Sequence, residues 1–406
     1  MSFDIALSGL GATNVQLNTI SNNIANVGTS GFKEARTEFS AVYNGMQPGG
    51  VEVASISQNF DKNGQVTGTG RALDLAISGG GFFMTKDAAG QTLYTRSGVF
   101  NTDKDNNIIS NGGMKLQGYG VDGNNQLQTG AVGDLKISTS SLAAKATDNM
   151  DFVANFDARV SQPLKADGTA QVFDANNPET FNSSYTTKVF DSLGNPHTVT
   201  QYFVKSGENK WDVHVQVDGG KVQVNNQNTY TYSVDFKQDG SLSAPVDAVD
   251  IAFAPPGAEA VTMDLNLKGS TQYGADFGVS TNNPNGYSSG QLAGVRVEDN
   301  GMVFATYTNG QSQLQGQVVL ANFANTQGLV KTSNTAWMES FSSGAPVTGE
   351  PGNGIFGGLT SGALEGSNVD LTTELVSLMT AQRNYQANAK TISTSDKLTQ
   401  TLFNAV

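Results

Sequence analysis

The sequence predicts a mainly β protein with α-helical termini, and three observations lead to this prediction. Apolar residues recur at helical spacing near both ends of the chain, whereas short β-type runs and turn residues alternate between about Phe32 and Gly366. Charged residues form only 15% of the chain, against roughly 25% in ordinary soluble domains, so uncharged polar residues cover most of the surface. Its 406 residues exceed the roughly 250–300 at which single cores stop growing, so two or more globular units are expected.

The first segment carries apolar residues at alternating spacings of three and four, which is typical of a coiled-coil seam. One polar residue, Thr13, belongs to the series, and the Gly28–Gly31 stretch is expected to end the helix. Asn14, Asn18 and Asn22 share a different, uncharged polar face. The seam residues that we expect to take part in subunit assembly are Phe3, Leu10, Leu17, Ile20, Ile24 and Val27.

The last segment repeats this pattern. Asp370 is the expected N-cap, and Glu374 lies in the first turn, where a negative charge favours a helix. One apolar stripe follows and continues less regularly to the end of the chain. Its expected assembly residues are Leu371, Leu375, Leu378, Tyr385, Ile392 and Phe403.

Hairpin signals recur in the region between the helices. Alternating valines flank Asp218-Gly219-Gly220, and further turns are expected at Asp299-Asn300-Gly301 and Asn309-Gly310. Composition shifts near 148–182 and 281–290 indicate crossings between globular units, which predicts a nested order. The predicted parts are a terminal helical coiled-coil domain (1–31 and 364–406), a connecting segment (32–70), a discontinuous inner β domain (71–147 and 283–363) and an inserted outer β domain (148–282).

Composition excludes several classes of function. A net charge of −13 repels phosphate backbones, so nucleic acid is not an expected partner. Cysteine is absent, which removes disulfides, thiolate metal sites and a cysteine nucleophile. Asp4 stands where a secretory signal would carry a basic residue, and no apolar run is long enough to span a membrane. We therefore expect neither a cleaved secretory signal nor membrane insertion.

No catalytic, cofactor-binding or metal-binding residue emerges from the motifs, so an enzyme is not expected. His197 and His214 have no carboxylate or serine at a spacing that known triads or zinc motifs use. The Asp103–Asn107 run begins like a calcium loop but lacks its glycine and its bidentate glutamate, which favours a plain turn. Arg71, Asp74 and Arg96 offer an acid–base set, yet dispersed charges are more often solvated or paired.

Several motifs resemble those of the flagellar rod and hook axial protein family. The N-terminal pattern is Ser21-Asn-Asn-Ile-Ala-Asn26 followed by Gly31-Phe-Lys33, and Gly70–Ser78 with Gly81-Phe-Phe83 resembles the start of the family's shared inner domain. At the other end, Gly362-Ala-Leu-Glu365, Asn368-Val-Asp-Leu371 and Ala381-Gln-Arg-Asn-Tyr-Gln386 resemble its C-terminal signature. The resemblance extends over nearly the whole chain. It implies a homopolymer, a curved extracellular tube that links rod to filament and transmits torque as a universal joint.

The same resemblance implies the partners of such a tube. These are a distal rod protein, a hook–filament junction protein, a hook cap protein and the flagellar type III export apparatus. The Val189–Asn195 run and Trp211, inside the predicted insertion, are similar to the outer domain of hook-type members and favour them over rod-type members. The alternatives are a distal rod or hook-associated axial protein, and a secreted β-rich binding module whose helices merely dimerise.

We predict that limited proteolysis of the free monomer removes about the first 30 and last 40 residues and leaves a stable β body. Gly9 and Gly11 each cost about 1 kcal/mol relative to alanine, so the first helix is marginal until a neighbour covers its seam. Mass spectrometry of the digest checks this. Equal protection of both ends and the body in the monomer would contradict it.

Overall fold

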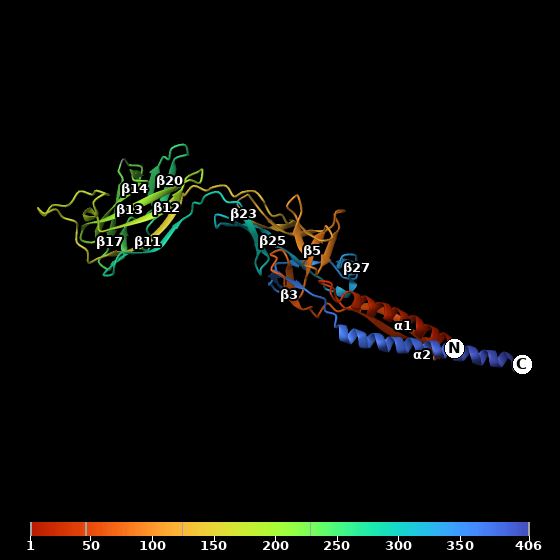
Figure 1. The fold of residues 1–406 in the computed structure, drawn as a ribbon. Helices are drawn as coiled ribbons and strands as arrows, with labels where there is room; N and C mark the ends of the chain where they lie inside the picture. Colours follow the sequence, from red (N-terminus) through yellow and green to blue (C-terminus); the bar gives the residue numbers. More distant parts are fainter. Residues whose placement is uncertain (1, 45–46, 124, 228, 405–406) are drawn as a thin grey trace. The chain divides into compact units, whose positions relative to one another are not determined.

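The computed structural model describes residues 2–44, 47–123, 125–227 and 229–404, and it confirms a mainly β chain with a helix near each end (Figure 1). The chain forms two compact units. Unit 1 contains residues 1–139, 293–306 and 312–406, and unit 2 contains residues 140–292 and 307–311. The second unit is therefore an excursion from the first, although the predicted boundaries at 148 and 282 stay a prediction.

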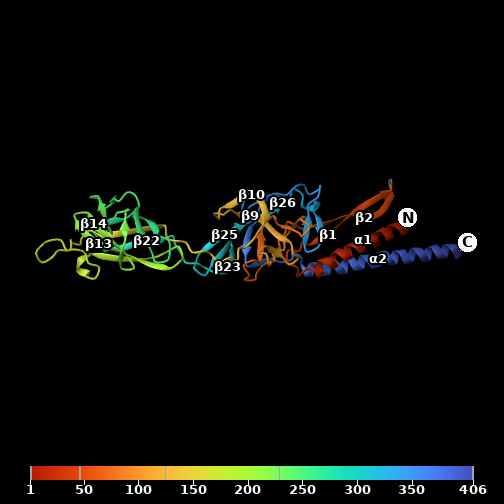
Figure 2. The same cartoon turned by 90° about the horizontal axis from the view of Figure 1, so that it is seen from above.

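Helices α1 (Ser2–Ala25) and α2 (Leu371–Asn404) lie side by side in unit 1 (Figures 1 and 2). Asn23 contacts Glu374 and Gly9 contacts Asn388, so the two helices run antiparallel. The predicted N-cap is confirmed, because the Asp370 carboxylate accepts a 3.0 Å hydrogen bond from the Thr373 amide.

The first helix ends earlier than the sequence predicted. Asn26 donates its side-chain amide to the Asn22 carbonyl at 2.9 Å and also to the Asn22 side chain. This local side-chain bonding competes with continuation of the helix. Val27 therefore lies in the turn after α1, and its assignment to a helical seam is wrong.

The region expected as a connecting segment contains a long antiparallel hairpin of β1 (Ala35–Asn44) and β2 (Gln47–Gln58). The hairpin lies along α1. Thr37 donates its hydroxyl to the Thr19 hydroxyl at 3.1 Å, and the Val51 amide donates to the Ser8 hydroxyl at 3.2 Å. Helix α1 is thus covered by α2 on one side and by the hairpin on another.

The β part of unit 1 is built on one large sheet, with 13 strands in the described residues and a core that includes Phe83, Phe100 and Leu116. Two short strand pairs accompany it, β3 (Val66–Gly68) with β31 (Ala363–Glu365) and β4 (Leu75–Ser78) with β30 (Gly358–Ser361). The strands of the large sheet are β5 (Phe82–Lys86), β6 (Thr92–Thr95), β7 (Phe100–Thr102), β8 (Ile108–Ser110), β9 (Lys115–Val121), β10 (Leu127–Asp134), β23 (Leu292–Val297), β24 (Met302–Tyr307), β25 (Ser312–Val318), β26 (Leu320–Asn322), β27 (Val330–Thr332), β28 (Ala336–Met338) and β29 (Val347–Gly349).

Unit 2 contains two six-stranded sheets whose inward residues share one core, including Phe156, Phe203 and Trp211. Burial alternates along β14, as expected for a strand with one face in a core. One sheet contains β11 (Asn149–Asp157), β16 (Gln223–Val224), β19 (Val249–Phe253), β20 (Val261–Asn266), β21 (Thr271–Tyr273) and β22 (Gly278–Pro284). The other contains β12 (Ser183–Phe190), β13 (Pro196–Gly207), β14 (Lys210–Val217), β15 (Gly220–Lys221), β17 (Thr231–Phe236) and β18 (Leu242–Ala244).

The predicted turns are confirmed. Asp218 and Gly219 have φ angles of +50° and +78°, the left-handed pair that a tight hairpin requires between β14 and β15. The hairpin is shorter than expected, because Val224 belongs to β16, which pairs with β19 in the other sheet. The Asp103–Asn107 run is also a turn, in which the Asp103 carboxylate accepts the amides of residues 105 and 107.

We predict that Asp264→Asn stabilises unit 2 at pH 7. Asp264 lies directly opposite Asp250 on neighbouring strands, and its hydrogen bond to Asp250, with a smaller contribution from partial desolvation, raises its pKa. A raised folded-state pKa gives stability that is complete below the unfolded value of about 3.9 and is lost as pH rises through the folded value. The gain at pH 7 should be about 0.5 kcal/mol or less, because the pair is screened by solvent.

Thermal unfolding followed by Trp211 fluorescence, in a Trp337→Phe background, measures this difference. The gain should vanish at pH 3, and the exposed control Asp247→Asn should have no effect at either pH. A pH-independent gain, or destabilisation at pH 7, would show that the two carboxylates do not repel each other.

Candidate functional site

The predicted assembly residues of α1 and α2 line surfaces that the chain itself covers only in part. Ile20 is buried, with 6% of its surface exposed, whereas Leu375 keeps 46% exposed. The half-buried members are Leu10, Leu17, Ile24, Leu378 and Ile392. The exposed members are Phe3, Val27, Leu371, Leu375 and Tyr385, and the Phe403 side chain lies outside the described residues.

Most of the buried side chains in the described parts of the two helices are small or polar, and Ile20 is the predicted assembly residue among them. The buried residues of the two helices are Ala6, Ala12, Thr13, Thr19, Ile20, Asn23, Glu374 and Ala381. Small residues let helix backbones approach closely without large apolar side chains between them. Several large residues are left partly or fully exposed. Exposed apolar residues of the two helices that the prediction omitted include Ile5, Leu7, Val376, Met379 and Leu398.

Gly9 has a packing role that helix propensity alone did not reveal. A Cβ atom built at Gly9 would lie 2.9 Å from the Asn388 side-chain nitrogen, closer than such contacts allow. The glycine therefore permits α2 to approach α1 at this point. Beside it, α1, α2 and the β1–β2 hairpin enclose a groove of about 480 Å³.

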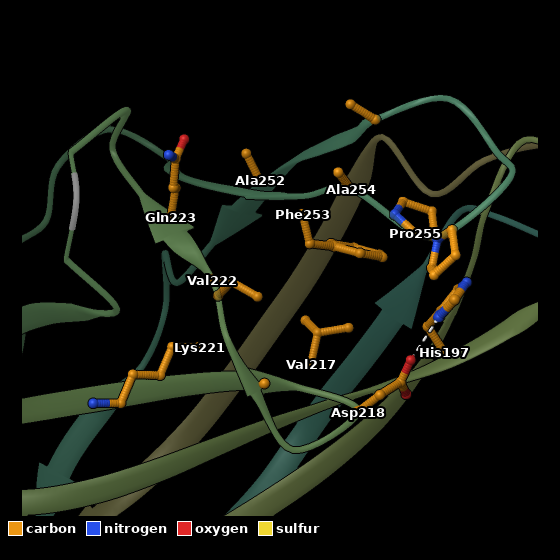
Figure 3. Close-up of a pocket in the computed structure, with 13 residues that line it drawn as sticks. His197, Val217, Asp218, Lys221, Val222, Gln223, Ala252, Phe253, Ala254 and Pro255 are labelled. Carbon is orange, nitrogen blue, oxygen red and sulfur yellow. Dashed lines mark hydrogen bonds and ion pairs between the residues drawn. The ribbon is translucent and has the colours of Figure 1, made fainter.

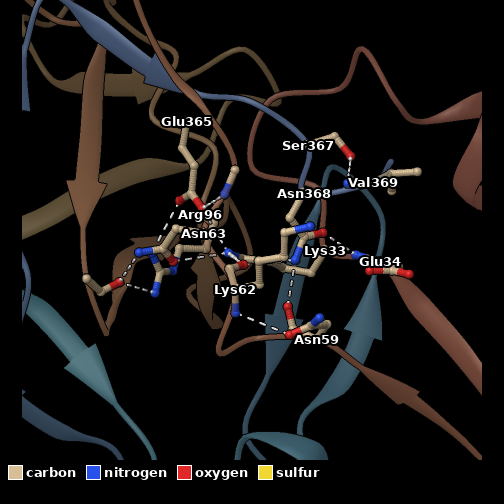
Figure 4. Close-up of polar contacts among 12 residues, drawn as sticks. Lys33, Glu34, Asn59, Lys62, Asn63, Arg96, Glu365, Ser367, Asn368 and Val369 are labelled. Atoms are coloured by element: carbon tan, nitrogen blue, oxygen red, sulfur yellow. Dashed lines mark hydrogen bonds and ion pairs between the residues drawn. The ribbon is translucent and has the colours of Figure 1, made fainter. Parts of the chain in front are cut away.

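A buried ionic cluster joins the base of the helices to the β body of unit 1 (Figure 4). The Glu365 carboxylate accepts from the Lys33 ammonium at 2.8 Å and from the Arg96 guanidinium at 3.2 Å. The Lys33 and Glu365 side chains have no exposed surface. Burial lowers the pKa of Lys33 and of Arg96, while the Glu365 charge opposes both decreases. One carboxylate thus holds two buried cations in place.

Backbone groups and an aromatic ring complete this ionic cluster. Lys33 also donates to the Lys62 carbonyl at 3.0 Å, and Arg96 donates to the Gly79 carbonyl at 2.8 Å and lies over the Phe82 ring. These contacts satisfy most donors of the two buried cations, although Arg96 Nε has no hydrogen-bond partner among the described residues. Arg71 and Asp74 form their own pair at 3.6 Å, so the structure does not assemble the acid–base set considered from the sequence.

Asn368 extends the polar contacts from the ionic cluster toward the helices. The Asn368 side chain accepts from the Glu34 amide at 2.7 Å and donates to the carbonyls of Asn59 and Lys62. Segments from both ends of the chain are thereby held together. Lys33, Glu365 and Asn368 belong to the motifs quoted for the family resemblance, but their spacing in the sequence did not predict these contacts.

The buried Asn23 fixes α1 to both of its neighbours. Its amide donates to the Ala35 carbonyl at 2.8 Å and to the Glu374 carboxylate at 3.1 Å. Burial raises the pKa of Glu374, and the nearby Glu34 charge adds to this increase. The other Glu374 oxygen has no hydrogen-bond partner among the described residues. The start of α2 is therefore docked through a buried carboxyl group whose pKa is raised.

Unit 2 holds a separate pocket of about 520 Å³ beside His197 (Figure 3). Contrary to the sequence-based interpretation, His197 lies between two carboxylates, 2.7 Å from Asp218 and 3.4 Å from Asp191. Burial opposes protonation, but these hydrogen bonds raise the pKa of His197. The same hydrogen bonds tie the turn at Asp191 to the hairpin end at Asp218, and the Asp218 carboxylate also accepts from the Thr198 hydroxyl at 2.9 Å.

The described part of the chain contains no helix that is long and apolar enough to cross a membrane. Within the same residues, no group of three or more histidine or acidic side chains is arranged to hold a metal ion.

Family models match four parts of the chain. They are the models described as flagella basal body rod protein (3–33), flagellar hook protein FlgE/F/G D1 domain (76–147), flagellar basal body protein FlaE D2 domain (155–287) and flagellar basal body rod FlgEFG protein C-terminal (360–405). The matches follow the order helix, inner β segment, outer β segment, helix.

Curated relatives match the whole chain. The flagellar hook protein FlgE of Escherichia coli is 41% identical and that of Salmonella typhimurium 39% identical, each over 100% of both chains. The crystal structure of Helicobacter pylori flagellar hook protein FlgE2 covers 74% of this chain and 100% of its own, with a TM-score of 0.53 and 13% identity. The structural match shows a shared fold, and the sequence matches show the family.

We predict that Glu365→Gln destabilises unit 1 by about 3–5 kcal/mol, because it leaves two buried cations without a negative charge. Lys33→Met should destabilise unit 1 less, because Arg96 still neutralises Glu365. The substitution also removes an ammonium group whose burial is costly, as its lowered pKa indicates. Denaturant unfolding followed by Trp337 fluorescence measures both. The surface ion pair of Arg296 and Glu298, 2.6 Å apart, provides the control, because Glu298→Gln should change stability by about 0.5 kcal/mol or less. Equal effects of Glu365→Gln and Glu298→Gln would contradict a stabilising ionic cluster.

Proposed function

The chain belongs to the flagellar hook protein family, and from this premise we propose that its two terminal helices and the β1–β2 hairpin form the polymerising part of a hook subunit. It is a structural component of the flagellar hook, and its polymer is the curved tube that links the basal-body rod to the filament. We assign it no catalytic role, because its family is structural.

One observation carries this proposal. Most of the residues that the two helices bury are small or polar, while large apolar side chains such as Leu375, Val376 and Met379 stay exposed along α2. Exposed apolar surface is stabilised when a partner covers it, by about 25 cal/mol per Å² removed from water. Neighbouring copies in a tube would supply that cover. The Asn14, Asn18 and Asn22 face is exposed and uncharged, which suits the wall of a channel that unfolded subunits cross.

The β units would then lie around the helical tube. Because charged residues are few, contacts between neighbouring β units would contain few directional ion pairs. Neighbouring β units can then shift against each other at a small cost in free energy, which suits a tube that bends while it rotates and transmits torque. We propose that this low charge is the physical basis of a universal joint.

The partners and route that we propose follow from the family. The tube would contact a distal rod protein at one end and a hook–filament junction protein at the other, and a hook cap protein would guide its growth. Subunits would leave the cell unfolded through the flagellar type III export apparatus, without a cleaved secretory signal. The absence of cysteine agrees with this route, since no oxidative folding step is needed.

We predict that Leu375→Asp and Leu378→Asp block tube formation but leave the monomer's melting temperature almost unchanged. Each puts an unpaired carboxylate into an apolar contact, at a cost of several kcal/mol per interface. Ile24→Asp, on the opposing helix, should act in the same way. Negative-stain microscopy of polymerised protein and circular dichroism of the monomer provide the two measurements.

Two variants serve as controls. Leu375→Met keeps an apolar side chain and should assemble normally. Ile20→Asp alters a residue that is already buried in the monomer and should loosen the helix pair there. Normal tubes from Leu375→Asp would show that the exposed stripe does not build the wall. Discrete particles from the unmodified chain would favour the binding module considered from the sequence.

A further inference from the structure

Phe341, on the loop of unit 1 that follows β28, has a fully exposed aromatic side chain. An isolated exposed apolar residue is ordinary when its loop is free to move. This loop is held by several hydrogen bonds. Ser340 donates its hydroxyl to the Gly328 carbonyl at 2.6 Å, and Asn325 donates its side-chain amide to the Ser342 carbonyl at 3.0 Å.

Close packing fixes the same loop further. Ser343 is buried and donates its hydroxyl to the Ser340 carbonyl at 2.9 Å. At Gly328, in the short helix η2 (Thr326–Gly328), an added Cβ would lie 2.5 Å from the Ser343 amide nitrogen. The loop is therefore packed directly against the backbone at Gly328, where a side chain would not fit. A rigid loop loses little conformational freedom when its aromatic residue is buried by a partner.

The groove between α1, α2 and the hairpin is a matching recess in the same unit. Its volume is about 480 Å³, and its apolar lining includes Ile5, Ala12, Phe39, Val51 and Ala387. None of the residues that line it is charged, and residues 340–346 are also uncharged. Two copies that each carry a net charge of −13 repel each other, so an uncharged contact is where they approach at least cost.

We propose that Phe341 of one copy inserts into the α1–α2–hairpin groove of a second copy. The two contacting surfaces are different parts of the molecule, so the contact is heterologous. Heterologous contacts generate rings or open helical polymers. An open polymer keeps a free Phe341 at one end and a free groove at the other. The inference rests on the proposed function and assigns one specific contact of the polymer.

The absence of cysteine makes a direct test possible, because an introduced thiol is unique. Ser342→Cys places a thiol beside Phe341, and Ala387→Cys places one on the rim of the groove. The two full-length variants are mixed, polymerised and treated with a short bis-maleimide linker, and linked peptides are identified by mass spectrometry. A link between 342 and 387 is expected in polymer and not in monomer. Val222→Cys, in the unit 2 pocket, replaces Ala387→Cys as the control.

Phe341→Ser should abolish this link and raise the critical concentration for assembly at least tenfold, whereas Phe341→Trp should retain the link. The melting temperature of the Phe341→Ser monomer should not change, because the side chain makes no contact that the fold needs. Tubes from the unmodified chain without a 342–387 link, a preferred link to Val222, or normal assembly of Phe341→Ser would overturn this contact alone. Failure of the unmodified chain to form tubes would overturn the proposed function together with it.

Discussion

The buried cluster of Lys33, Arg96 and Glu365 is the constraint on which the rest of unit 1 depends. Glu365 lies just before α2 and Lys33 just after α1, so a single carboxylate fixes where both helices leave the β body. Removing one partner from such a cluster leaves an unpaired buried charge, which costs far more than a surface pair. Asn368 and Asn23 add hydrogen bonds that set the direction of the two chain segments. The antiparallel helix pair follows from this fixed base.

Once the base is fixed, side-chain size separates two kinds of contact along the helices. Most of the fully buried helix residues are small or polar, whereas leucine, valine and methionine side chains stay partly or fully exposed. A helix pair that buried its large residues internally would be more stable alone, but it would leave less exposed apolar surface for a neighbouring copy to cover. This division connects the packing of one chain to the assembly of many, because the uncovered apolar area is what a polymer contact can bury.

Unit 2 has a hydrophobic core of its own. Its core is filled from its own two sheets, so its stability does not depend on the helices or on the large sheet of unit 1. The His197 ion pairs contribute to this independence by holding the turn at Asp191 and the hairpin end at Asp218 in place. An excursion with a complete core can vary without disturbing the base on which polymerisation rests.

The sequence by itself determined the features that local rules control: two terminal helices, the Asp370 N-cap, the glycine turns, the β character of the middle and the family motifs. It did not identify the β1–β2 hairpin or the early end of α1, where alternation is irregular and side-chain hydrogen bonds compete with the helix. Only the tertiary structure brought Lys33 to Glu365, 332 residues away, and left most of the predicted stripe half-buried or exposed while small and polar residues were buried. Periodicity defines the faces of a helix, but which face a neighbour covers depends on contacts between segments distant in the chain.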